Sequence, residues 1–195
     1  MSPEEAVADY ILNCRVFARA EMCTFEAEPS LHAAIRRAAL CLLPDKKRHP
    51  HQYRIPGSLL EQAEARLQAI AVRLRGAGDF ATLHGLIDTE ISSLHGISEL
   101  TIYDIAHRIG AYLKKAPQLV YLHRGTRTGA AVFGLGGRTI RPDQLPTAFW
   151  RLTPAEIEDC LCIYKDHLKS GQHGVRDGGR PCLTRKPKHY SECGN

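Results

Sequence analysis

The chain has 195 residues, of which 44% are hydrophobic and 24% are charged. This composition is typical of a soluble globular protein and excludes disorder of the whole chain, and no apolar run approaches the roughly 20 residues of a membrane span. The formal net charge is +5, but residues 169–195 hold six Lys/Arg against two Asp/Glu, so residues 1–168 carry only +1.

The N-terminal sequence MSPEEAVADY is acidic where a secretory signal peptide is basic and then apolar. Seven cysteines are an odd number, and they are scattered without the short spacings of a disulfide framework. We therefore expect a cytoplasmic protein whose thiols are reduced.

Apolar residues recur at three- and four-residue spacing along the first part of the chain, which is the pattern of helices with one buried face. Asp79 is the expected N-cap of the fourth helix, and Thr101, with Asp104 three residues on, is the expected cap of the fifth. The five predicted helices cover about residues 3–20, 30–42, 58–74, 80–94 and 101–113.

The next part of the chain is less regular. Residues 118–122 fit either a short strand or a buried turn, and five glycines between residues 125 and 146 argue against one long element there. Thr153, Pro154 and Glu156 then give a capping box with a first-turn proline, which predicts a helix. The expected fold class is mostly all-α, with one compact helical domain over residues 1–168 and a mobile basic tail over residues 169–195.

The segment from Leu94 to Gly110, LHGISELTIYDIAHRIG, has the strongest functional pattern in the chain. One helix ends at Leu94, a tight turn follows, and the next helix begins with its first amides exposed. Backbone N–H groups at a helix N-terminus attract anions, and the helix dipole adds partial positive charge. Gly96 permits a backbone conformation or a close approach that a side chain would obstruct.

This segment resembles the helix-hairpin-helix motif, whose usual form is L-x-G-[IV]-G-x-x-T-A-x-x-I. Ser98 replaces the second glycine of the motif, and Ile102 replaces the small residue after the threonine. The matching positions are Leu94, Gly96, Ile97, Thr101 and Ile105.

The resemblance implies a helix-hairpin-helix near residues 86–113 that binds DNA without sequence preference, holding a backbone phosphate on the hairpin amides. Ser98 keeps an N–H donor although it replaces a glycine, whereas the carboxylate of Glu99 opposes an anion beside it. A plain turn between two helices is the alternative. The DNA-binding residues expected in the hairpin are Gly96, Ile97, Ser98 and Thr101.

Among enzymes, the helix-hairpin-helix DNA glycosylases are similar to this region over about 30 residues. In that superfamily a helix, a proline and a catalytic aspartate follow the hairpin, and bifunctional members carry a lysine directly before the threonine. Leu100 occupies the lysine position here, and Leu122, counted from Pro117, occupies the aspartate position. Leucine neither transfers a proton nor forms a Schiff base, so the resemblance implies DNA binding without the catalysis of that family.

A second candidate anion site follows at residues 123–129, HRGTRTG, where three potential cations and two hydroxyls stand between glycines. A loop of this kind holds a phosphate through its amides and guanidinium groups, and a solvated turn with a helix start is the alternative. Arg138 and Arg141 extend the same surface if the chain folds back. The expected contacts within the segment are His123, Arg124, Thr126 and Arg127.

Three further clusters carry weaker patterns. The basic run Lys46–His51 is either a solvated loop or a partner-binding segment. Cys160 and Cys162 point to different faces of a helix, so no metal site is expected, with a zinc site in the tail as the alternative. Asp104 and His107 are close enough on one helix to touch, but no nucleophile–base set stands out, and neither a catalytic residue nor a cofactor is expected.

The sequence thus predicts a DNA-binding protein that contacts the phosphate backbone through the hairpin, the 123–127 segment and the basic tail. Two alternatives from other classes stay open. One is a divergent DNA glycosylase or lyase that acts on damaged DNA, with Asp104 as the nearest carboxylate. The other is a helical protein-interaction module that meets an acidic protein partner. No membrane association is expected, and the sequence does not determine the oligomeric state.

Overall fold

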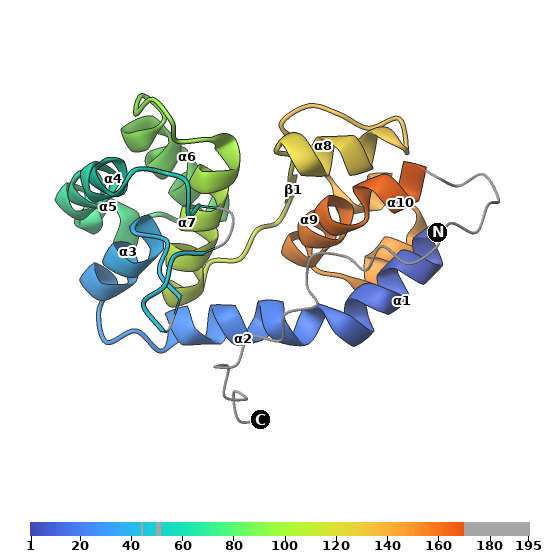
Figure 1. Cartoon of the computed structure of the whole chain (residues 1–195), viewed down its shortest axis with the longest axis horizontal. Coiled ribbons are helices and arrows are strands. Elements are labelled where there is room, and N and C mark those ends of the chain that lie inside the picture. Colours follow the sequence, from blue (N-terminus) through green and yellow to red (C-terminus); the bar gives the residue numbers. More distant parts are fainter. Residues whose placement is uncertain (44, 50–51, 170–195) are drawn as a thin grey trace. The chain divides into compact units, whose positions relative to one another are not determined.

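The computed structural model describes residues 1–43, 45–49 and 52–169 (Figure 1). Helices dominate this part of the chain, as the sequence predicts, and the two strands within it are two residues each. None of the helices in these ranges is both long enough and apolar enough to cross a lipid bilayer. Apart from its first residue, the predicted basic tail lies outside the described residues.

Where the sequence predicts one helical domain, the described residues group into two compact units. Unit 1 combines residues 1–19 with residues 118–169, and unit 2 comprises residues 20–117. Helix α2 (Arg15–Glu26) crosses this division, because its first five residues belong to unit 1 and the others to unit 2. Unit 1 is therefore built from two segments that lie far apart in the sequence.

Unit 2 is a group of helices in which α7 packs against both α3 and α6, and α4 packs against α3 and α6. The buried residues have the predicted helical spacing, for example Leu83, Ile87 and Ile91 on α6, and Ile105 and Ile109 on α7. After α2, the helices of unit 2 are α3 (Leu31–Ala39), α4 (Gly57–Ala69), α5 (Ala71–Arg75), α6 (Phe80–Ile91) and α7 (Glu99–Tyr112).

The helix boundaries of unit 2 confirm one prediction and correct two. Asp79 caps α6 as predicted, and its side chain accepts a hydrogen bond from the Thr82 amide at 2.8 Å. The helix predicted over residues 58–74 is interrupted at Ile70 (φ −107°, ψ 16°), which separates α4 from α5. The cap of α7 is Ser98 rather than Thr101, because Ser98 has the extended backbone of an N-cap and its side chain accepts from the Thr101 amide.

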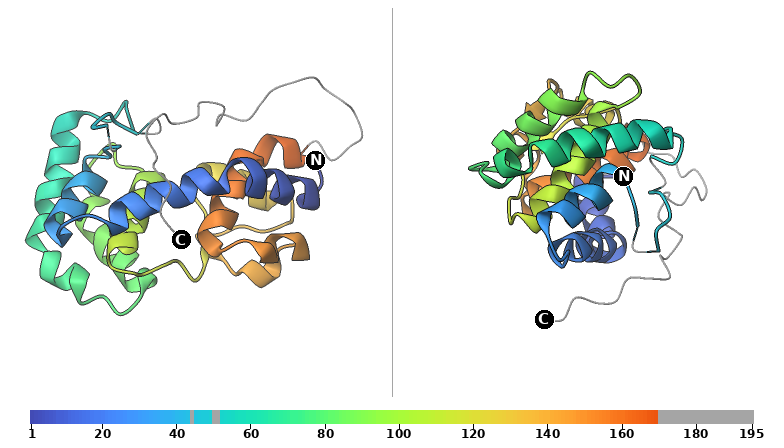
Figure 2. Two further views of the ribbon diagram at one scale, coloured as in Figure 1. Left: turned by 90° about the horizontal axis from the view of Figure 1, so that it is seen from below. Right: turned by 90° about the vertical axis from the view of Figure 1, so that its left-hand side faces the viewer.

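Unit 1 packs its helices around a second apolar core. Figure 2 shows α8, α9 and α10 close together, in agreement with the contacts among them. The single helix predicted over residues 3–20 is divided at Cys14, which ends α1 and precedes α2. The elements of unit 1 besides α2 are α1 (Pro3–Asn13), β1 (Val120–Tyr121), α8 (Arg124–Ala131), β2 (Thr139–Ile140), η1 (Pro142–Gln144), η2 (Thr147–Arg151), α9 (Pro154–Ile163) and α10 (Lys165–Lys169).

Two local predictions for unit 1 are settled by the structure. Strand β1 pairs antiparallel with β2, with Val120 opposite Ile140, so the 118–122 segment contains a strand rather than a buried turn. Helix α9 begins with the predicted capping box, in which Thr153 and Glu156 exchange side-chain and backbone hydrogen bonds and Pro154 follows the cap. Helix α8 lies between the two strands in the sequence and packs against α9.

Candidate functional site

A four-residue turn, Leu94–Ile97, joins α6 to α7. The Ile97 amide donates to the Leu94 carbonyl at 3.0 Å, which closes the turn. Gly96 occupies the third position of the turn with a φ of 107°. A type II turn requires a positive φ at this position, and residues other than glycine rarely adopt a positive φ. The turn backbone therefore explains the glycine that the sequence singles out.

The turn is fixed on one side and exposed on the other. Leu94 is buried, and a Cβ atom added to Gly96 would lie 3.0 Å from Cδ2 of Leu59, near the start of α4. His95, Gly96 and Ser98 are nevertheless exposed. The hairpin, by which we mean α6, the turn and the start of α7, thus packs on the core of unit 2 through Leu94 and exposes residues of its turn.

The first residues of α7 leave amide donors at this exposed turn. The Ser98 side chain accepts from the Thr101 amide at 3.2 Å, and the Ser98 carbonyl accepts from the Ile102 amide at 3.0 Å. The Thr101 hydroxyl is buried against Ser98 Oγ at 3.0 Å, so Thr101 stabilises the cap rather than facing a ligand. Within the described chain, no hydrogen bond occupies the amides of Ser98 and Leu100.

Arg66 of α4 places a cation beside the hairpin. Its Nη1 atom donates to the Glu90 carbonyl at 3.0 Å and to Ser93 Oγ at 2.9 Å, directly before the turn. Sequence reasoning missed Arg66, because its place depends on the packing of α4 against α6 and no local pattern indicates it. Glu99 follows Ser98 in the sequence, and its exposed carboxylate reduces the positive potential at the turn.

The second predicted anion site, residues 123–129, is the start of helix α8 rather than a loop. Its His123 and Thr126 side chains are buried beside Glu158, which lies on α9. The His123 ring bonds to the Glu158 carboxylate, and the Thr126 hydroxyl lies 2.7 Å from His123 Nε2 and 3.0 Å from Glu158 Oε1. These two side chains hold α8 to α9 and do not reach solvent. Of the four predicted contacts, Arg124 is exposed and Arg127 is half-buried.

The glycines of this segment have a packing role. A Cβ atom at Gly129 would lie 2.3 Å from the Leu161 carbonyl oxygen, and one at Gly125 would lie 2.8 Å from Cys162 Sγ. Both distances are shorter than a van der Waals contact, so only glycine allows α8 to approach α9 this closely. The glycines of HRGTRTG are therefore explained by the contact between α8 and α9.

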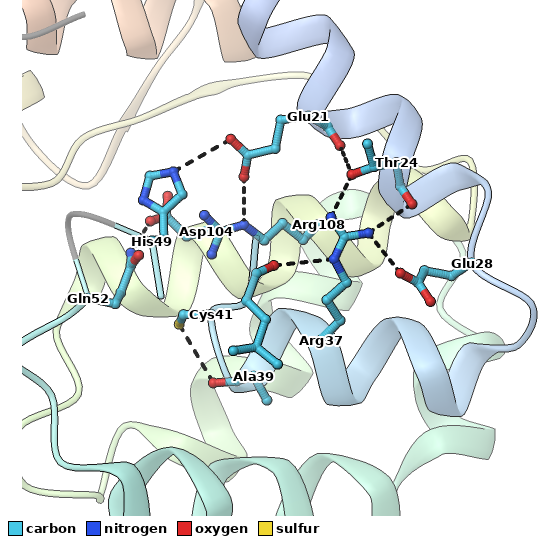
Figure 3. Close-up of polar contacts among 11 residues, drawn as sticks. Glu21, Thr24, Glu28, Arg37, Ala39, Cys41, His49, Gln52, Asp104 and Arg108 are labelled. Atoms are coloured by element: carbon cyan, nitrogen blue, oxygen red, sulfur yellow. Dashed lines mark hydrogen bonds and ion pairs between the residues drawn. The ribbon is translucent and has the colours of Figure 1, made fainter. Parts of the chain in front are cut away.

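A charged network lies inside unit 2 (Figure 3). Arg108 of α7 forms an ion pair with Glu21 of α2 at 3.0 Å, and the His49 ring lies 3.5 Å from the same carboxylate. Burial alone would raise the pKa of Glu21, but Arg108 and His49 lower it to about 2. Asp104 accepts a hydrogen bond from Gln52. These contacts tie α2, the chain after α3 and α7 together.

Arg37 extends the network along α2. Its guanidinium bonds to the Thr24 hydroxyl at 2.7 Å, to the Thr24 carbonyl at 3.0 Å and to the Glu28 carboxylate at 2.7 Å (Figure 3). It also donates to the Leu42 carbonyl at 3.2 Å. Arg37 thus joins α3 to α2, and Arg108 joins α7 to α2.

The spacing of Asp104 and His107 on one helix suggests that their side chains touch. In the structure, the two side chains lie in different surroundings. Asp104 bonds to Gln52, whereas the His107 ring stacks on Tyr103 at 5.7 Å between centroids and meets the edge of Phe80 at 6.5 Å. Burial lowers the pKa of His107, which favours the neutral ring in this aromatic cluster.

The remaining candidates from the sequence are the cysteines, the basic run and the position of the glycosylase aspartate. Cys160 is buried in the unit 1 core, and burial raises the pKa of its thiol. Among the described residues, no group of three or more His, Cys, Asp or Glu side chains is placed to hold a metal ion. In the basic run, Lys47 pairs with Asp45 at 3.0 Å. Leu122, at the position of the glycosylase aspartate, is buried in the same core as Cys160.

No protein-family model, curated protein sequence or solved structure matches this chain. The assignment of a function therefore depends on the chain's own geometry. The exposed arrangement best suited to a ligand is the hairpin, where amide donors, a helix N-terminus and Arg66 all favour an anion.

Proposed function

We propose that this protein binds DNA without sequence preference, by holding a backbone phosphate at the hairpin between α6 and α7. The observation that carries the proposal is the Leu94–Ile97 turn, in which Gly96 takes a φ of 107° and after which, among the described residues, no hydrogen bond occupies the amides of Ser98 and Leu100. Three of the four turn residues, Leu94, Gly96 and Ile97, match the helix-hairpin-helix pattern in the sequence.

The chemistry of the hairpin supports a phosphate ligand. The amides of Ser98 and Leu100 are neutral donors at the positive end of the α7 dipole, which favours an anion over a neutral group. Arg66 adds a full positive charge near the same turn. Amides and guanidinium groups that contact phosphates carry no information on base sequence, so the binding is sequence-independent.

The proposal is tested by a matched pair of glycine substitutions in the full chain. Gly96→Ala puts a side chain into a left-handed conformation, which costs about 1 kcal/mol and displaces the turn. Gly85→Ala makes the same chemical change within α6, where no atom lies within 4 Å of the added Cβ. We expect Gly96→Ala to weaken binding of a fluorescein-labelled duplex several-fold, measured by anisotropy, and Gly85→Ala to leave it unchanged.

Thermal unfolding by circular dichroism shows whether both variants are folded at the temperature of the binding assay. Equal affinities of folded Gly96→Ala and the parent chain would contradict a role for the hairpin in DNA binding.

A further inference from the structure

A histidine–carboxylate pair lies under the first turn of α8. The ring of His123 bonds through Nε2 to the carboxylate of Glu158 on α9, and the Thr126 hydroxyl donates to the same carboxylate at 3.0 Å. His123 and Glu158 are buried, with exposed fractions of 4% and 8%. Because the carboxylate accepts the proton on Nε2, the neutral ring keeps its lone pair on Nδ1. His123 is therefore oriented to accept a further proton at Nδ1.

Cys162 lies beside this second nitrogen of the ring. The point at which a Cβ atom of Gly125 would stand is 2.8 Å from Cys162 Sγ and 3.8 Å from His123 Nδ1. The thiol and the ring nitrogen thus border the same space next to Gly125. Cys162 and Glu158 are four residues apart on α9, so they share the face of that helix that packs on α8.

The surroundings of Cys162 favour a thiolate. Its Sγ atom lies at the start of α8, where the helix dipole places partial positive charge. Lys165 brings a cation nearby, since its Nζ atom donates to the Cys162 carbonyl at 3.2 Å and lies 3.7 Å from Asp166. Cys162 is partly exposed, whereas Cys160, the other cysteine of α9, is buried. A partly exposed thiol next to positive charge is the setting in which cysteines are nucleophilic.

We propose that Cys162, His123 and Glu158 are the nucleophile, the base and the orienting carboxylate of an acyl-transfer site. The arrangement of a nucleophile, a base and a third group that orients the base is recognised by geometry rather than by sequence order. The expected substrate is a small acyl group in an ester or thioester, because Cys162 is only partly exposed. Unit 1 supplies all three residues, and the inference does not depend on DNA binding.

The proposed reaction has two steps. The Cys162 thiol passes its proton to His123 Nδ1 while the sulfur attacks the carbonyl carbon, and the imidazolium gives this proton to the departing alcohol or thiol as its bond to the acyl group breaks. The acyl group is then held on Sγ as a thioester. Water attacks this thioester, one of its protons passes to Sγ by way of Nδ1, and the carboxylic acid is released. Glu158 stays ionised and stabilises the imidazolium, so it is a positioning residue.

The test uses the full chain with p-nitrophenyl acetate as the acyl donor. Peptide mass spectrometry locates the acetyl group, and absorbance follows the release of p-nitrophenolate. Cys23 of α2 is the internal reference, because Cys23 and Cys162 are the two partly exposed cysteines of the described residues. We expect Cys162 to be acetylated about 100-fold faster than Cys23, which is the effect of a positioned base.

Three variants sharpen this comparison, and circular dichroism shows whether each is folded. Cys162→Ala is expected to abolish the initial burst of p-nitrophenolate, whereas the matched Cys23→Ala leaves it unchanged. Glu158→Gln removes the charge that stabilises the imidazolium. We expect it to lower the maximal rate of Cys162 acetylation about tenfold at an unchanged half-saturating ester concentration, because Glu158 does not contact the ester.

The outcomes are separable from those for the hairpin, because Gly96→Ala affects DNA binding alone. Faster acetylation at Cys162 than at Cys23, with a lower maximal rate in folded Glu158→Gln, supports the acyl-transfer site. Equal rates at the two cysteines of the parent chain overturn it, and this comparison needs no substitution that could impair folding. Equal maximal rates in folded Glu158→Gln and the parent show that the histidine–carboxylate pair does not activate the thiol, and they also overturn it.

Discussion

The hairpin of unit 2 and the start of α8 in unit 1 look alike in sequence, since each places glycine beside polar residues that favour anions. Their glycines have different tasks. Gly96 supplies a backbone conformation, with a φ of 107° in an exposed turn. Gly125 and Gly129 have no side chain, which allows α8 to pack closely against α9.

The difference extends to the polar neighbours of these glycines. Ser98 is exposed beside its turn, whereas His123 and Thr126 are buried against Glu158. Under the proposed function, the difference is that the hairpin leaves its donors accessible to solvent, whereas the start of α8 buries the side chains of His123 and Thr126. Four expected results test this distinction, beginning with the largest effect.

The largest effect is expected at the α8–α9 contact. Gly129→Ala places a methyl group 2.3 Å from the Leu161 carbonyl oxygen, and we expect it to lower the free energy of unfolding by about 3 kcal/mol. Gly136→Ala is the control, because nothing lies within 4 Å of its added Cβ, and its effect is expected to stay within about 0.5 kcal/mol. Urea unfolding followed by circular dichroism measures both. Similar stabilities of the two variants would show that α8 does not need glycine at this contact.

Acid is expected to destabilise unit 2 through Glu21. Its folded-state pKa of about 2 lies below the ordinary value of 4.5, so the ion pair contributes stability above about pH 4.5 and loses it as the pH falls toward 2. The full contribution is about 2 to 3 kcal/mol. We expect Glu21→Gln to lose this amount at pH 7 and to show a flatter stability profile between pH 5 and 2. A parallel profile for the variant and the parent would contradict the role of Glu21.

Two substitutions within the HRGTRTG segment are expected to have opposite effects. Thr126→Val removes a buried hydroxyl that bonds to His123 and Glu158, so it is expected to reduce stability by about 1 kcal/mol and leave DNA affinity unchanged. Arg124→Ala removes an exposed cation that the sequence predicts as a phosphate contact, so it is expected to weaken DNA binding and change stability by less than about 0.5 kcal/mol. Urea unfolding and anisotropy on both proteins give the comparison. Loss of DNA affinity in Thr126→Val at unchanged stability would contradict a purely structural role and support Thr126 as a DNA contact.

Sequence patterns predict this fold where the determining contacts are local. The caps at Asp79 and Thr153 and the buried stripe of α6 follow from residues within one or two turns, and the structure confirms them. The interruptions at Cys14 and Ile70 were not predicted, because the apolar spacing continues across both positions.

The candidate sites, too, can be predicted from the sequence only where the contacts that determine them are local. The turn at Gly96 is encoded locally, so its glycine and its exposed donors are visible in the sequence. The burial of His123 depends on Glu158, and the placement of Arg66 depends on helix packing, so neither can be inferred from neighbouring residues. The division into two units likewise depends on residues 1–19 folding with residues 118–169.

The smallest expected effect gives the most direct test of phosphate binding at the hairpin. Glu99 is the first residue of α7, and it is exposed between the two residues whose amides are proposed to bind the phosphate, Ser98 and Leu100. Glu99→Lys reverses the charge at this position and leaves both of those amides in place. Glu99→Gln removes the carboxylate alone.

The measurement is duplex affinity by anisotropy for these two full-length variants and the parent. We expect Glu99→Gln to bind more tightly than the parent, because it removes a negative charge beside the phosphate, and Glu99→Lys to bind about fivefold more tightly than the parent, which corresponds to about 1 kcal/mol. Equal affinities of Glu99→Lys and the parent would contradict the claim that a phosphate is held at the hairpin.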